Sequence, residues 1–184
     1  MAFLLCVGFG GYSVMRKLGS GVGCPLTGRY ALMGALIEGI HILLIELVKK
    51  FWTAFEEELN SSDYLDSELC SFPNGSCEIT SQMLALYLKS SGINNVVYTR
   101  NKTNQLEIGS IHYWVVVEDR IIIDLTAHQF KEFEGSAICD VDSEFHRLFK
   151  QLRVNSPELE SLERPSSRAN TQFFERLMSR LERA

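Results

Sequence analysis

Three residues of this chain have the types that nucleophilic thiol catalysis requires: Cys77, His112 and Asp124. That chemistry needs a thiolate that attacks, a base close to it, and a third group that orients the base. Cys77 directly follows a Gly-Ser turn and is expected in the first turn of a helix, where the positive end of the helix dipole favours the thiolate. The backbone N–H groups of that turn are also suited to hold an oxyanion. Cys77 is therefore the candidate nucleophile.

His112 and Asp124 lie in two neighbouring segments that have the composition of strands. Residues 111–117 and 121–125 are rich in β-branched and aromatic side chains, and residues 118–120 stand between them as a short hairpin connection. A three-residue connection puts His112 on the same face as Asp124, opposite or diagonal to it, whereas two or four residues would separate them. Because Asp124 ends an apolar run, it needs a partner, and an imidazole N–H is a natural one. We therefore predict that the two side chains meet.

Each of the three residues also has a structural interpretation. Cys77 is then a small buried packing residue, His112 a satisfied histidine at a strand edge, and Asp124 a cap beside Thr126. A metal site that also uses Cys70 is a further alternative, but zinc ligands usually come in tighter pairs than Cys70 and Cys77 form. The sequence therefore predicts neither a metal nor a cofactor.

Three further residues, Ser76, Trp114 and Gln129, are candidates to contact the substrate or its oxyanion, and one more histidine is considered as the base. Ser76 precedes the nucleophile and is expected to cap its helix. Trp114 shares a face with the candidate base by strand alternation, and is expected to line a cleft or to fill the core. Gln129 is a candidate to bind substrate, to donate to an oxyanion or to hold a turn. His128 is a second candidate base, whereas His146 has no neighbour that suggests a partner.

The order of elements that must position these residues predicts an α+β fold. The apolar spacing predicts one helix over about 30–59 and a second over 77–91, and the strands are followed by a helical pattern and a charged helix over 170–184. We expect three parts along the chain. They are a glycine-rich, irregular N-terminal arm (1–30), a single domain (31–155) and a C-terminal helical extension (156–184).

The stretch from Phe72 to Phe130, about a third of the chain, resembles the transglutaminase-like and papain-like thiol superfamily. The matching pieces are Gly75-Ser76-Cys77 at a helix start, His112-Tyr113-Trp114-Val115 on a strand, and Ile123-Asp124-Leu125-Thr126 on the next strand. The resemblance implies a papain/transglutaminase-like core, in which the helix with the nucleophile packs on a small antiparallel sheet, with flanking N- and C-terminal helices.

The same resemblance implies a cysteine-dependent hydrolase or acyl transferase that acts on amide or isopeptide bonds. Such an enzyme is a peptidase, a glutamine deamidase or a transglutaminase, and it works through a Cys-His-Asp triad and a thioester intermediate on a protein or peptide substrate. A non-catalytic protein-binding module of the same fold is the alternative.

Composition limits the partners and the compartment. The net charge of −5 and the pI near 5.4 argue against a nucleic-acid binder, because there is no basic excess to displace phosphate counterions. The most apolar later stretch, 36–48, carries two glutamates and is too short to span a bilayer. Five scattered cysteines without a close pair favour a reducing cytoplasm, with secretion as an effector left open, and nothing indicates the oligomeric state.

Overall fold

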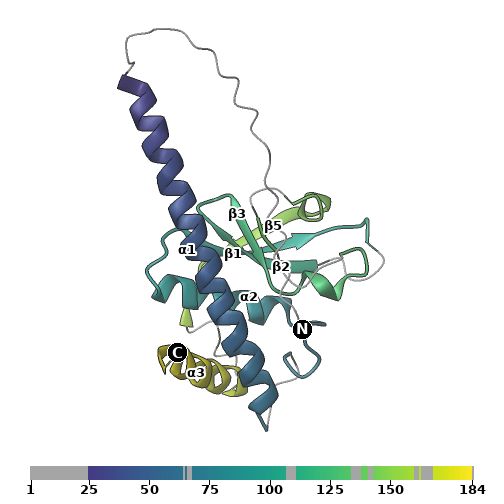
Figure 1. The fold of residues 1–184 in the computed structure, drawn as a ribbon. Helices are drawn as coiled ribbons and strands as arrows, with labels where there is room; N and C mark the ends of the chain where they lie inside the picture. Colours follow the sequence, from purple (N-terminus) through teal and green to yellow (C-terminus); the bar gives the residue numbers. More distant parts are fainter. Residues whose placement is uncertain are drawn as a thin grey trace.

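The computed structural model of the chain describes residues 25–63, 65, 68–106, 111–133, 138–140, 143–159, 162 and 168–183. Within them, three α-helices accompany one five-stranded sheet, which confirms the prediction of an α+β fold (Figure 1). The helices are α1 (Pro25–Ser61), α2 (Cys77–Ser90) and α3 (Arg168–Arg183). The strands are β1 (Val96–Lys102), β2 (Ile111–Val117), β3 (Ile121–Asp124), β4 (Ile138–Asp140) and β5 (Lys150–Asn155), and two short 3₁₀ turns are η1 (Ala127–Gln129) and η2 (His146–Leu148).

The sheet is antiparallel throughout, in the order β4-β3-β2-β1-β5. Helix α2 packs on β1 and β2, and the long helix α1 packs on α2, while its N-terminal part projects beyond the sheet (Figure 1). One core joins these layers through fully buried side chains such as Phe51 and Phe55 of α1, Met83 of α2, and Val115 and Ile123 of the sheet. Of the described helices, none contains an apolar stretch long enough to cross a membrane.

The first helix begins earlier than the sequence pattern suggested. Residues 25–30, expected to belong to the irregular arm, are helical, because α1 starts at Pro25. Proline suits the first position of a helix, since its fixed φ matches the helix and its missing N–H would be unpaired there. The rest of the expected arm, 1–24, lies outside the described residues.

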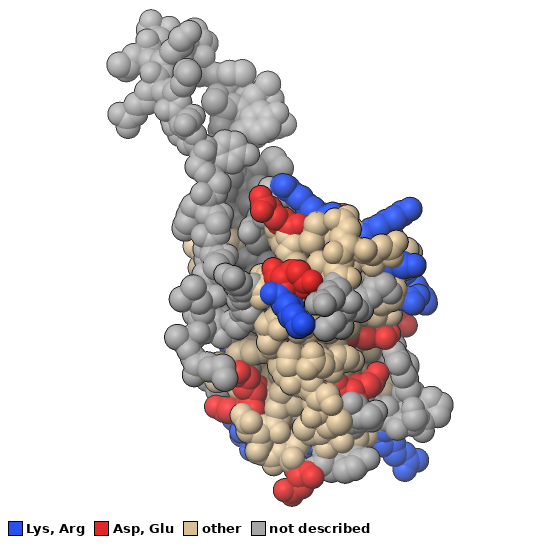
Figure 2. Space-filling model, turned by 90° about the vertical axis from the view of Figure 1, so that its right-hand side faces the viewer, with Lys and Arg blue, Asp and Glu red and all other residues tan. Residues whose placement is uncertain are grey.

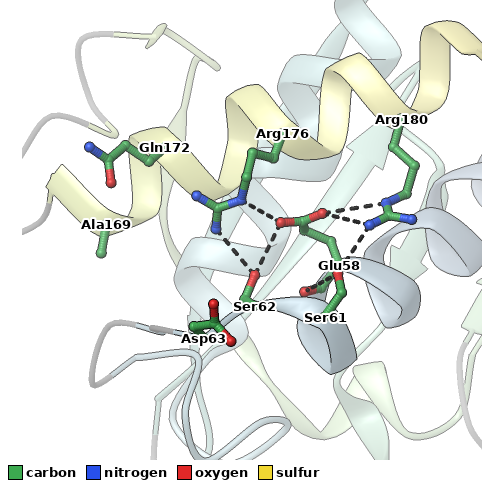
Figure 3. Close-up of a pocket in the computed structure, with 8 residues that line it drawn as sticks. All are labelled: Glu58, Ser61, Ser62, Asp63, Ala169, Gln172, Arg176 and Arg180. Atoms are coloured by element: carbon green, nitrogen blue, oxygen red, sulfur yellow. Dashed lines mark hydrogen bonds and ion pairs between the residues drawn. The ribbon is translucent and has the colours of Figure 1, made fainter.

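Helix α3, which the sequence pattern set apart in an extension, contributes Phe173 and Leu177 to the common core. Two of its cations also reach the buried carboxylate of Glu58 on α1, where Arg176 bonds one oxygen and Arg180 bonds the other (Figure 3). These contacts line a cavity of about 390 Å³ between the end of α1 and α3. Packing and ion pairs together attach α3 to α1.

The helical pattern expected beyond Phe130 is wrong, because β4 and β5 are strands. Strand β5 pairs with β1 at the edge of the sheet, and most of its side chains are exposed, including Leu152 and Val154 at 48% and 51%. A strand held by edge hydrogen bonds rather than by burial leaves little apolar periodicity in the sequence.

The β2–β3 hairpin has the three-residue connection that the sequence analysis required. Val117 pairs with Ile121, so residues 118–120 form the turn, and Arg120 donates its N–H to the carbonyl of Val117 at 3.2 Å. Continued by one residue beyond the last pair, this register places Asp124 opposite position 114. His112 then lies diagonal to Asp124 on the same face, which is one of the two predicted arrangements.

Candidate active site

Cys77 is the first residue of α2, as predicted, and it is 8% exposed. Ser76 is the N-cap residue, as predicted, but its side chain makes no cap bond, because its hydroxyl donates to the carbonyl of Pro73 at 2.8 Å. The tight turn before the helix takes the hydroxyl away from the first-turn N–H groups. The side chain of Ser76 leaves the first-turn N–H groups uncapped, and the positive end of α2 lies at Cys77.

His112 and Asp124 form the hydrogen bond that the hairpin geometry predicts. Nε2 of His112 lies 2.6 Å from Oδ2 of Asp124, and the two residues are 0% and 1% exposed. The other carboxylate oxygen, Oδ1, accepts bonds from the backbone N–H and the hydroxyl of Thr126, at 2.8 and 3.1 Å. The carboxylate is therefore held at both oxygens and points one of them at the imidazole.

The charges around His112 set the protonation of its ring. Burial lowers the pKa of His112, but the charge and hydrogen bond of Asp124, together with those of Cys77, raise it to about 9. Burial raises the pKa of Asp124, but the charge and hydrogen bond of His112 outweigh it and hold that pKa well below its usual range. Because Nε2 faces the carboxylate, Nδ1 is the nitrogen that does not contact Asp124.

Gln129 lies on η1 and touches the same ring. Its Nε2 donates to the carbonyl of Thr126 at 3.0 Å and lies 3.2 Å from Nδ1 of His112. The carbonyl fixes which end of the amide faces the ring, because the amide oxygen in that place would meet another acceptor. Of the roles considered for Gln129, the contacts match the one that holds the turn, and they add a contact to the base that the sequence did not indicate.

His146 has a partner that its position in the sequence did not suggest. Its Nε2 lies 3.2 Å from Oδ2 of Asp124, the oxygen that His112 also bonds, and its Nδ1 lies 2.8 Å from the hydroxyl of Ser143. The contact joins residues 22 positions apart, and His146 lies on a short 3₁₀ turn, so sequence spacing does not predict this contact.

Aromatic rings enclose the two histidines. Trp114 packs on both, with its ring centre 5.7 Å from that of His112 and 4.5 Å from that of His146. Phe130 meets His112 edge-on at 4.8 Å, and Phe149 lies 5.8 Å from the same ring. Trp114 thus shares the face of His112 as predicted and is buried. These rings exclude water from the polar network and so strengthen its electrostatic interactions.

The remaining candidates lie in other contacts. The ring of His128, the second candidate base, packs on Trp52 and Phe72 at 6.3 and 5.9 Å. Cys70 is exposed whereas Cys77 is buried, and the two form no disulfide. Over the part of the chain that the structure describes, no group of three or more ligating residues is arranged to hold a metal ion.

Comparison with protein-family models, with curated proteins and with solved structures gives no match to this chain.

Proposed function

We propose that this chain is a cysteine-dependent hydrolase or acyl transferase with a papain/transglutaminase-like core, acting on amide or isopeptide bonds of a protein or peptide. The observation that carries the proposal is the buried pair of His112 and Asp124, whose side chains lie 2.6 Å apart, together with Cys77 at the first turn of α2, which also contributes to the raised pKa of His112. A nucleophile, a base and an orienting acid from α2, β2 and β3 are the parts that thiol catalysis needs.

In the first half of the reaction, the thiol proton of Cys77 passes to Nδ1 of His112 and the sulfur attacks the carbonyl carbon of the substrate. The negative charge that forms on the carbonyl oxygen is stabilised by N–H groups in the first turn of α2. The C–N bond then breaks, and His112 returns the proton to the departing nitrogen as ammonia or an amine. The product is a thioester on Cys77.

In the second half, His112 takes a proton from water or from an incoming amine, which attacks the thioester carbonyl. Collapse of that intermediate breaks the C–S bond and returns the proton to the sulfur. Throughout, Asp124 holds the proton of Nε2, so that Nδ1 is the nitrogen that exchanges protons with the reacting groups. Water as the acceptor gives a peptidase or glutamine deamidase, and a lysine amine gives a transglutaminase.

The burial of the site favours a second candidate, a non-catalytic binding module of the same fold. Cys77 is only 8% exposed and His112 is fully buried, whereas a substrate carbonyl must reach the sulfur. Alkylation separates the two candidates, because Cys70 provides an exposed reference thiol in the same chain.

The test is alkylation by iodoacetamide across pH, read for each cysteine by mass spectrometry. We expect Cys77 to react faster than the exposed Cys70, and still to react at pH 6, because the imidazole of His112 is the base that takes the thiol proton. His112→Gln should remove this advantage, and His128→Gln, the matched control, should not. If Cys70 reacts first and Cys77 shows the behaviour of an ordinary thiol, the binding module is the correct interpretation.

Turnover distinguishes the reaction types. A glutamine-containing peptide is offered with and without hydroxylamine, and ammonia, glutamate and hydroxamate are measured. Ammonia with glutamate indicates deamidation, and the hydroxamate indicates a thioester open to amines. Cleavage of the peptide backbone indicates a peptidase. Cys77→Ala should abolish whichever product the intact chain forms.

A further inference from the structure

A second histidine is bound to the carboxylate that orients His112. Nε2 of His146 and Nε2 of His112 both approach Oδ2 of Asp124, at 3.2 and 2.6 Å. The side chain of His146 is 2% exposed, and that of Asp124 is 0% exposed, so this contact is formed away from water. A buried polar ring in contact with the orienting acid calls for an explanation beyond packing.

The carboxylate of Asp124 assigns a proton to Nε2 of His146. An ionised carboxylate can only accept, so the ring nitrogen 3.2 Å from Oδ2 carries a proton and donates it. The other nitrogen, Nδ1, lies 2.8 Å from the hydroxyl of Ser143, which also accepts the backbone N–H of His146 at 3.4 Å. A chain of hydrogen bonds thus runs from Ser143 through His146 and Asp124 to His112.

His146 also completes the hydrogen bonds of a buried anion. An ionised carboxylate has about four acceptor positions, and Asp124 receives four donors: two from Thr126, one from His112 and one from His146. The bond from His146 is among the causes that keep the pKa of Asp124 low, after burial, which raises it, and the larger effect of His112. Without that donor, a lone pair of a desolvated carboxylate has no partner.

We propose that His146 is a positioning residue for Asp124: its Nε2–H keeps the buried carboxylate ionised and aimed at His112. This inference rests on the proposed function, since it assigns a role within the same site. Its effect on Cys77 passes through Asp124 and His112.

Packing is the competing explanation. The ring of His146 meets Trp114 edge-on with centres 4.5 Å apart, and it contacts Phe145 at 5.2 Å. A phenyl ring would keep these contacts and lose the donor, whereas a glutamine amide would keep a donor and lose the ring. His146→Phe and His146→Gln are therefore a matched pair.

The experiment compares the rate constant for alkylation of Cys77 by iodoacetamide at pH 7 in the intact chain and in both variants. We expect His146→Phe to lower the rate constant about tenfold, because the buried carboxylate loses one of its donors, and His146→Gln to stay within about twofold of the intact chain. The proton NMR signal of the Nε2–H between His112 and Asp124 should move in the Phe variant and return in the Gln variant.

Two results would overturn the proposal: His146→Phe behaving like the intact chain, or the Gln variant losing as much as the Phe variant. If the Phe variant does not fold, Ser143→Ala and Ser143→Thr replace it in the experiment, since only threonine keeps the hydroxyl that contacts Nδ1 of His146 and so orients the ring. The alkylation rate constant of Cys77 should then fall about threefold in the alanine variant and stay unchanged in the threonine variant. A Cys77 that is unreactive in the intact chain contradicts the proposed function instead, and the NMR signal still decides the role of His146.

Discussion

Asp124 and Glu58 are two buried carboxylates, 1% and 4% exposed, whose partners differ in kind. Glu58 is held by Arg176 and Arg180 of α3 and by Ser62, and these bonds lower its pKa against the opposing effect of burial (Figure 3). Asp124 is held by two histidines and by Thr126. Arginine keeps its proton at every accessible pH, whereas an imidazole exchanges one near neutrality. The first arrangement can only anchor a helix, and the second can also move protons.

The surroundings of the two carboxylates also differ, because the partners of Glu58 are partly exposed to solvent and those of Asp124 are buried. The arginine side chains beside Glu58 are 47% and 33% exposed and line an open cavity, while the histidines beside Asp124 are enclosed by aromatic rings. On the face of the molecule shown in Figure 2, acidic and basic side chains are interspersed in the same solvated way. A solvated ion pair contributes modestly to stability, and a dry one has a large effect on the charges next to it.

The largest expected effect comes from removing the charge of Asp124 while keeping its shape. In Asp124→Asn, the imidazole loses the anion that supports its charged form and the acceptor that fixes its tautomer. Alkylation of Cys77 at pH 6 should fall about 100-fold, because the imidazole no longer has the anion that lets it hold a second proton.

The matched control is Asp119→Asn, which removes an exposed carboxylate from the β2–β3 turn and should leave the rate unchanged. An Asp124→Asn chain that folds and alkylates like the intact one would show that the carboxylate has no part in the reactivity of Cys77.

The pH dependence of stability should separate the two carboxylates. The pKa of His112 rises from 6.5 to about 9 on folding, so the stabilisation is complete below pH 6.5 and is lost as the pH rises through about 9. Over that interval, the free energy of unfolding should fall by up to about 1.4 kcal/mol per pH unit. The pKa of Glu58 is lowered, so its contribution is lost on the acid side instead.

Urea unfolding at several pH values measures how the free energy of unfolding changes with pH on the acid and alkaline sides. His112→Gln should reduce the fall on the alkaline side, and Glu58→Gln should not. An alkaline slope that persists in His112→Gln would assign it to another group.

At the second carboxylate, Glu58→Gln should lower the free energy of unfolding by about 1–2 kcal/mol, because two arginines lose their anion but remain partly solvated. Glu57→Gln is the control, since its side chain is 56% exposed and it bonds only one of the same arginines in the interactions described. Urea unfolding gives the two values, and alkylation of Cys77 should be unchanged in both variants. A loss of Cys77 reactivity in Glu58→Gln would mean that the two regions are coupled.

Whether a feature of this site can be predicted from the sequence depends on whether residues close together in the chain determine it. The helix start at Cys77 and the pairing of His112 with Asp124 were predictable, since a short turn and a three-residue connection determine them. The partner of His146 was not, because it depends on how η2 packs against the sheet. The hydroxyl of Ser76 was assigned to the wrong bond for a related reason: the preceding turn offers it the carbonyl of Pro73.

The smallest expected effect lies at Gln129, and it goes in the opposite direction to that of Asp124. Its Nε2–H faces Nδ1 of His112 at 3.2 Å, and only an imidazole without a proton on Nδ1 can accept that bond. Gln129 therefore opposes the charged ring that Asp124 supports. Gln129→Met, which keeps the length of the side chain without the donor, should raise the alkylation rate of Cys77 about threefold on the acid limb of the pH profile.

The exposed loop variant Gln105→Met is the control for Gln129→Met and should leave the profile unchanged. A role for Gln129 in binding the substrate oxyanion predicts instead that alkylation stays the same while turnover falls. A slower reaction in Gln129→Met would mean that the amide supports the reactive form of the site. In that case Gln129 and Asp124 would not have opposite effects on the charge of His112. The orientation of the His112 ring, rather than its charge, would then limit the reactivity of Cys77.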